Sequence, residues 1–251
     1  AIVPQPDWHG DYRDFKKLGR PRLFFGVSPG AMDSMVNHYT ANRRRRSDDA
    51  YTPGGRPGAR PDMPSIVYSK ILRELYPDVP IVLGGIEASL RRLSYYDYWE
   101  DRLRPSLLTE CEADIITYGM GEKVTVEIAE RLSNVTEMLS REDKIELLKD
   151  IPQVVCRQHK VEAIGGDVVL HPFEQCLRDK RCQAENFRHI EEESNKWHAE
   201  RIWQLTPVFD AEGKKAASYE AVLTTAGCYK AEALVKFCDA FGISVLTLTN
   251  V

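Results

Sequence analysis

The sequence has 251 residues, which is enough for one large α/β domain or for a domain with an appendage. With 43% hydrophobic and 29% charged residues, it has the composition of a soluble globular protein. A net charge of −4 gives no global attraction to nucleic acid, and no apolar run reaches the ~18 residues of a membrane span, so we expect no membrane partner.

The first residue is Ala1 rather than methionine, so we expect a preceding segment and leave a targeting sequence open. The cysteines are scattered and show no Cys-x-x-Cys spacing. This pattern predicts neither a disulfide framework nor a zinc site, but reduced and mostly buried thiols. The six are Cys111, Cys156, Cys176, Cys182, Cys228 and Cys238.

Short apolar strands alternate with helical patterns in the first half of the chain. Strands are predicted over 22–27, 80–85 and 114–118, and helices over 65–75, with Ser65 as N-cap, and 122–132. Such alternation is typical of an α/β fold with a doubly wound, Rossmann-like parallel sheet. We assign this sheet to a domain over residues 1–132.

Two further regions follow this domain. Residues 133–203 are predicted to form a mostly helical C-terminal extension, with one long charged helical region over 173–203. Residues 204–251 are predicted to be a divergent αβ segment, with a helix near 234–241 and a strand over 243–248.

The two clearest strand ends carry glycines. Gly84 and Gly85 follow the strand at 80–85, and Gly119 and Gly121 follow the strand at 114–118. Glycine lets backbone N–H groups approach a ligand at the edge of a parallel sheet, and Glu87 or Glu122 could then bind a hydroxyl or a cation. Alternatively, the glycines only permit tight turns, and Glu122 only favours a helix start. The sequence leaves both interpretations open.

A second candidate is a long segment, residues 41–64, rich in arginine, glycine and proline. Segments of this length without regular structure are usually functional or mobile. Its arginines could grip an anionic substrate as a closing lid, or contact RNA. The alternative is a solvated loop that pairs with its own aspartates, Asp48, Asp49 and Asp62. The core of the segment is Asn42, Arg43, Arg44, Arg45 and Arg46, and Arg56 and Arg60 follow.

A third candidate is the run at 91–99, where arginines alternate with tyrosines and a tryptophan. Such a patch could stack bases or a flat cofactor, or pack against a neighbouring domain. The histidines have no metal-ligand spacing. Asp7-Trp-His-Gly10 is similar to the Asp-x-His-x-x-Gly sequence that binds cobalamin, but its glycine follows the histidine directly, so we do not expect cobalamin.

Four stretches together resemble one known family. Residues 32–55, 80–99, 118–122 and 170–198 are similar to signature stretches of YgiQ-type radical SAM proteins, and the resemblance covers roughly residues 1–203. It is a resemblance to the N-terminal domain, whose outline is similar to cobalamin-binding domains. The signature positions include Asn42 to Arg46, Gly84, Gly85, Glu87, Gly119, Gly121 and Glu122.

The resemblance implies a cytoplasmic enzyme with a [4Fe–4S] cluster and S-adenosylmethionine, in which closely spaced cysteines hold the cluster. No part of this sequence contains the Cys-x-x-x-Cys-x-x-Cys pattern, so the cluster ligands are expected outside this chain and no catalytic residue is assigned. The implied role is to pack on the radical SAM core of the same polypeptide and shape access of an unidentified substrate. The alternative is a stand-alone module that binds cobalamin, a nucleotide or RNA without catalysis.

Overall fold

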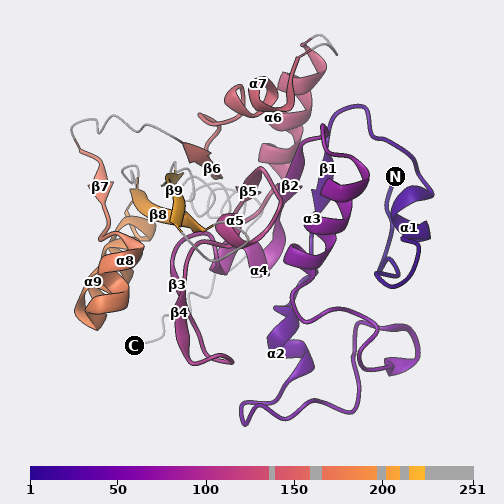
Figure 1. The fold of residues 1–251 in the computed structure, drawn as a ribbon, viewed down its shortest axis with the longest axis horizontal. Coiled ribbons are helices and arrows are strands. Elements are labelled where there is room, and N and C mark those ends of the chain that lie inside the picture. The colour runs from indigo at the N-terminus through magenta and orange to yellow at the C-terminus, as the bar shows by residue number, and fades with distance from the viewer. Residues whose placement is uncertain (136–138, 159–165, 197–201, 210–214, 224–251) are drawn as a thin grey trace, which may run out of the picture.

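A computed structural model describes residues 1–135, 139–158, 166–196, 202–209 and 215–223 (Figure 1). Its centre is a seven-stranded mixed sheet with the order β1-β2-β5-β6-β9-β8-β7. A separate antiparallel pair, β3 (Tyr95–Asp97) and β4 (Arg102–Arg104), projects from it as a hairpin. The sheet strands are β1 (Phe25–Val27), β2 (Ile81–Leu83), β5 (Ile115–Thr117), β6 (Val154–Gln158), β7 (Val168–Val169), β8 (Ile202–Phe209) and β9 (Lys215–Leu223).

The predicted parallel sheet is confirmed for β1, β2 and β5, the strands that residues 1–132 contribute to the main sheet. Strand β2 pairs in parallel with both β1 and β5. The sheet as a whole is mixed, because β6, β9 and β8 continue it in antiparallel fashion and only β7 pairs in parallel again. The parallel sheet predicted for residues 1–132 is therefore part of a larger, mixed sheet. An antiparallel addition needs only a backbone edge, which the short β5 offers to β6.

Helices cover the sheet on both faces and make two hydrophobic cores. Ile81, Leu83 and Ile116 face the core formed with α3, α4 and α5, whereas Val82 and Ile115 face the core formed with α6. Because side chains alternate along a strand, a strand buried on both sides must be apolar throughout, as β2 and β5 are. The helices are α1 (Arg13–Lys16), α2 (Ser34–His38), the short 3-10 helix η1 (Pro53–Gly55), α3 (Pro64–Leu75), α4 (Gly85–Leu90), α5 (Leu107–Glu110), α6 (Glu122–Ser133), α7 (Arg141–Glu146), α8 (Phe173–Arg178) and α9 (Lys180–Ser194).

The N-cap of helix α3 lies two residues earlier than the sequence predicts. Pro64 is its first residue and Met63 is the N-cap, so the assignment of Ser65 as N-cap is wrong. Proline suits the first helical position because its missing N–H would have no partner there. The N–H of Ser65 instead donates to the Glu87 carboxylate at 3.2 Å, which ties the start of α3 to α4.

The described residues after 132 include strands as well as helices. Strand β6 lies inside the main sheet, and the described part of the predicted helical region over 173–203 contains α8, α9 and the start of β8. The break falls at Asp179, whose backbone is extended and whose side chain accepts from the Arg181 N–H as the N-cap of α9. The helix predicted near 234–241 and the strand over 243–248 lie outside the described residues.

Among the helices in the described part of the chain, none combines the length and the apolar composition that crossing a bilayer requires.

Candidate functional site

The carboxyl ends of β1 and β2 meet in a tightly packed pair of turns. Gly85 has a φ of +83°, and a Cβ atom there would lie 2.8 Å from Ser28 Oγ and 3.3 Å from the Gly30 carbonyl oxygen. A side chain at this position would therefore be strained and would collide with the turn that follows β1. Protein atoms, rather than a ligand, occupy the space that this glycine leaves.

The turn after β5 lies at the same edge. A Cβ atom on Gly84 would lie 3.1 Å from Thr117 Oγ1, so the two glycine turns are neighbours. Gly119, with a φ of +69°, donates its N–H to Ser89 Oγ at 3.2 Å. Gly121 is the N-cap of α6, and Glu122 is its exposed first residue. The structure thus brings the sequence-predicted glycines together and places Glu122 at the rim.

Glu87 is the most deeply buried of the predicted site residues, with no exposed surface. One carboxyl oxygen accepts the Ser65 N–H, and the other has no hydrogen-bond partner among the described residues. Burial raises the pKa of Glu87, against the opposing effect of Ser65 and the Arg91 guanidinium. Burial therefore makes the carboxylate form of Glu87 less favourable than it would be for an exposed glutamate.

Arg91, one turn after Glu87, is buried and forms an ion pair with Asp33. Asp33 is also the N-cap of α2, because its side chain accepts from the N–H groups of Met35 and Val36. One aspartate therefore holds both the start of α2 and the end of α4. This contact fixes the point from which the arginine-rich segment leaves the sheet.

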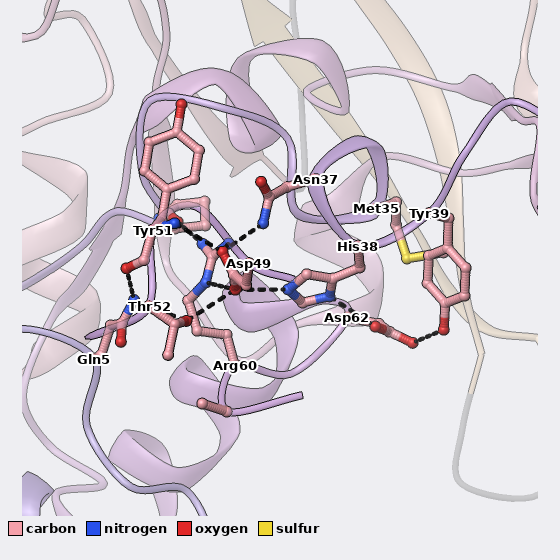
Figure 2. A network of polar contacts seen from close by, with 12 residues as sticks. Gln5, Met35, Asn37, His38, Tyr39, Asp49, Tyr51, Thr52, Arg60 and Asp62 are labelled. Carbon is pink, nitrogen blue, oxygen red and sulfur yellow. Dashed lines mark hydrogen bonds and ion pairs between the residues drawn. The ribbon is translucent and has the colours of Figure 1, made fainter. Parts of the chain in front are cut away.

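A second buried aspartate organises the arginine-rich segment itself (Figure 2). Asp49 is 1% exposed and accepts hydrogen bonds from Asn37 Nδ2 at 2.7 Å, Thr52 Oγ1 at 2.9 Å and the Tyr51 N–H at 2.9 Å. Arg60 grips it with two nitrogens, Nε at 3.0 Å and Nη2 at 3.1 Å. Although burial opposes ionisation, Arg60 and these donors hold the pKa of Asp49 well below its usual range.

The same network continues to the sheet edge and to α2. Arg60 Nη1 donates to the Pro29 carbonyl at 3.4 Å, in the turn after β1. His38 lies between two carboxylates, with Nδ1 2.9 Å from Asp62 Oδ1 and Nε2 3.5 Å from Asp49 Oδ2. Figure 2 shows His38 between them and Tyr39 on the far side of Asp62, to which its hydroxyl donates at 2.7 Å. The two ends of the arginine-rich segment are thus fastened to the carboxyl edge of the sheet.

The remaining arginines form a separate, exposed structure, the arginine hairpin, which we define as residues 39–46. Tyr39 bridges Arg45, and backbone hydrogen bonds join Thr40 to Arg44 and Arg46 to His38. Arg43 has a φ of +58°, as expected for the last residue of a three-residue hairpin loop. Residues 41–46, including Asn42 and all four arginines, are exposed.

The structure places the arginine hairpin against the aromatic run at 95–99. The guanidinium of Arg43 lies 4.8 Å from the ring centroid of Tyr98, whose hydroxyl donates to the Ala41 carbonyl at 2.6 Å. The rings of Tyr39 and Trp99 lie 5.5 Å apart. Two patches that the sequence separates by about fifty residues are therefore one surface, and the aromatic patch packs on a segment of its own domain.

A pocket of about 450 Å³ lies elsewhere, between β4, α5 and α8. Its lining includes Arg104, Glu110, Phe173 and Leu177, and none of the sequence-predicted site residues takes part.

The described cysteines do not form a metal site. Cys111, Cys156, Cys176 and Cys182 are free and buried, and the described residues hold no group of three His, Cys, Asp or Glu side chains placed to bind a metal. Burial raises the pKa of Cys111 and of Cys176 to about 11, which keeps both as thiols. A [4Fe–4S] cluster needs several thiolates close together, and the four described cysteines are not grouped in that way.

Sequence reasoning found the glycine turns and the exposed arginines but missed the residues that hold them in place. Asp33, His38, Asp49 and Arg60 carry the buried contacts. The sequence pattern indicates Arg60 and Asp49 only as members of a charged loop, and His38 only as one of the histidines without metal-ligand spacing. The sequence Pro53-Gly54-Gly55 could have indicated this contact, because it predicts a turn between Asp49 and Arg60.

The fold and the site together define an α/β domain. An arginine-rich segment is attached to this domain at the carboxyl ends of the sheet strands. The family model described as "Radical SAM N-terminal" matches residues 1–215, and the chain belongs to this family. The match extends beyond the resemblance noted in the sequence, past β8 to the first residue of β9.

Relatives support the same assignment. The chain is 58% identical to a UPF0313 protein of Bacteroides thetaiotaomicron and 56% identical to one of Porphyromonas gingivalis, with 81% of the chain covered in each case. It is 50% identical over 78% of its length to a UPF0313 protein of Geobacter sulfurreducens. The alignments cover 34%, 32% and 31% of these relatives, so the chain spans about a third of their length. No solved structure matches the chain.

Proposed function

We propose that this chain is the N-terminal portion of a radical SAM iron–sulfur enzyme, that it packs on the catalytic barrel of the same polypeptide, and that it shapes substrate access. The observation that carries the proposal is the match of the Radical SAM N-terminal model to residues 1–215. The three-layer arrangement supports a Rossmann-like description of residues 1–132, and no solved structure relates it to a cobalamin domain.

The cofactors belong to the same proposal. A [4Fe–4S] cluster that binds S-adenosylmethionine supplies radical chemistry. Because the described cysteines are buried and are not grouped as cluster ligands, the cluster thiolates would come from another part of the polypeptide. Such clusters need reducing conditions, so a cytoplasmic location follows from the proposal.

Within this proposal, the anchored segment is the part of the chain that meets the substrate entrance. The ion pair between Asp49 and Arg60 anchors the segment, whereas its arginine hairpin is exposed and can approach an anion. The sequence suggests a moving lid over residues 41–64. We assign this movement to the arginine hairpin alone, because movement of the whole segment would break the buried ion pair between Arg60 and Asp49. Gly85 then allows the turn after β1, to which Arg60 is bonded, to pack closely on the start of α4.

The test uses the whole polypeptide, purified without oxygen. Iron and sulfide in a ratio near that of a [4Fe–4S] cluster, together with reductive cleavage of S-adenosylmethionine, are the expected result. A whole polypeptide that binds neither iron nor sulfide would overturn the proposal. A cobalamin absorption spectrum in that iron-free protein would instead point to a binding module.

A further inference from the structure

We propose that the arginine hairpin and the aromatic residues beside it form a binding surface for a single-stranded polynucleotide. This surface comprises Arg43, Arg44, Arg45 and Arg46 together with Tyr96 and Tyr98 on the β3–β4 hairpin. The inference goes beyond the proposed function, because it depends on no iron–sulfur chemistry. Figure 1 shows the β3–β4 hairpin and the segment after α2 reaching the same, lower end of the molecule.

Carboxylates of the described residues do not pair with the arginines of the arginine hairpin. In the described part of the chain, no ion pair joins any of these four guanidinium groups to a carboxylate, and all four side chains are exposed. Of the nearby acids, Asp62 is bound by His38 and Tyr39, and Glu100 is bound by Arg102 and Arg104. Asp48 and Asp101 stay exposed, which leaves a local positive excess on a chain of negative net charge.

The aromatic rings give this surface a second chemistry. Tyr96 is 56% exposed and Tyr98 is 47% exposed, although both are large rings that folding would normally bury more fully. Tyr98 is held edge-on to Trp99, with ring centroids 5.3 Å apart at 79°, and lies under the Arg43 guanidinium. Its orientation is therefore fixed before any ligand arrives, which lowers the entropic cost of binding.

Guanidinium groups beside exposed, oriented rings fit a polynucleotide better than another anion. Arginines neutralise phosphates, and tyrosine rings stack on unpaired bases with little sequence preference. An acidic peptide would use the arginines but leave the rings without a partner. A duplex would use the phosphates, but its bases are already stacked. The geometry thus points to single-stranded RNA or DNA.

The first experiment measures binding of a labelled mixed-sequence RNA of about 12 nucleotides to the whole polypeptide, within the size range of such sites. If four phosphates are contacted, affinity should fall roughly 50-fold between about 50 mM and 200 mM salt, from a slope of about −0.7 per contact. Single-stranded DNA, duplex DNA and polyglutamate are the other arms. Equal binding of RNA and single-stranded DNA supports stacking and phosphate contact, whereas weaker DNA binding indicates an additional contact to the 2′-hydroxyl.

A matched pair of charge variants locates the surface. Replacing Arg43–Arg46 with alanine should weaken RNA binding at least tenfold. Replacing Arg13, Lys16, Lys17 and Arg20, which are also exposed and carry the same total charge, should change it less than twofold. Equal losses in the two variants, unchanged binding in the first, or no measurable binding by the unaltered protein would overturn the proposal.

A second pair tests the ring independently of the arginines. Tyr98→Phe loses the hydrogen bond to Ala41 but keeps the stacking face, whereas Tyr98→Ala loses both. Binding should fall at least about fivefold in Tyr98→Ala and little in Tyr98→Phe. Equal binding by the two variants, or equal affinity of the unaltered protein for RNA and polyglutamate, would show an anion surface without base stacking and would contradict the proposal.

Discussion

The arginine-rich segment contains two regions of opposite character. Arg60 is buried and grips a buried aspartate with two nitrogens, while Arg43–Arg46 project into solvent without a carboxylate partner in the described residues. Burial decides the difference, because an ion pair shielded from water resists disruption and an exposed guanidinium remains available to a ligand. Arginines within one segment of sequence can therefore serve stability and recognition separately.

Removing the buried guanidinium of Arg60 should have the largest effect on stability. Arg60→Ala leaves the Asp49 carboxylate buried without its main partner, and we expect the free energy of unfolding to fall by about 3–5 kcal/mol. Urea denaturation measures the change. The control is Arg56→Ala, an exposed residue of the same segment, for which we expect a change within about 0.5 kcal/mol. Similar changes in the two variants would show that burial does not distinguish these arginines.

The close packing of Gly85 against the turn after β1 can be tested by substitution. Gly85→Ala should destabilise the protein by more than the ~1–2 kcal/mol of a left-handed backbone, because its Cβ would also meet Ser28 Oγ and the Gly30 carbonyl. Gly54→Ala is the matched control, since Gly54 has a φ of +70° but no atom within 4 Å of its Cβ. Urea denaturation of both variants separates crowding from backbone strain, and equal losses would rule out the crowding.

The two buried carboxyl groups should respond to pH in opposite directions. The lowered pKa of Asp49 means that its contribution to stability is present above its unfolded pKa of about 3.9 and is lost as pH falls toward the lower folded value. The raised pKa of Glu87 means that its contribution is present below about 4.3 and is lost as pH rises through the folded value. Acid therefore lowers the contribution of Asp49 to stability, whereas a rising pH lowers the contribution of Glu87.

Glu87→Gln isolates the second effect. The amide oxygen can still accept the Ser65 N–H, but no charge develops in the buried site. We expect the stability of Glu87→Gln relative to the unaltered protein to increase as pH rises above about 4.3. Urea denaturation at a series of pH values measures this difference. A difference that stays constant with pH would contradict the raised pKa.

The smallest effects on stability are expected in the arginine hairpin. Single alanine substitutions at Arg44, Arg45 and Arg46 should each change the free energy of unfolding by no more than about 0.5 kcal/mol, because these side chains are exposed. Thermal or urea unfolding measures the change. A loss above about 1 kcal/mol at any of them would reveal a structural contact and weaken the contrast with Arg60.

The sequence by itself determined the three strands of the main sheet within residues 1–132 and the two longest helices there. Apolar runs that end in glycine predict β2 and β5, and apolar residues at helical spacing predict α3 and α6, because these signals depend on neighbours in the chain. The same reasoning failed at β6 and at the break between α8 and α9. Strand pairing is set by a partner far away in sequence, and the extended backbone of Asp179 interrupts a locally helical pattern.

Only the tertiary structure decided which charged residues act together. Nothing in the sequence distinguishes Arg60 from Arg56, yet Arg60 folds onto Asp49 and the turn after β1. Likewise, the contact of Arg43 with Tyr98 arises because two hairpins project to the same side of the sheet. Burial and long-range contact set the energy of a charge, and neither is encoded in the local pattern of residues.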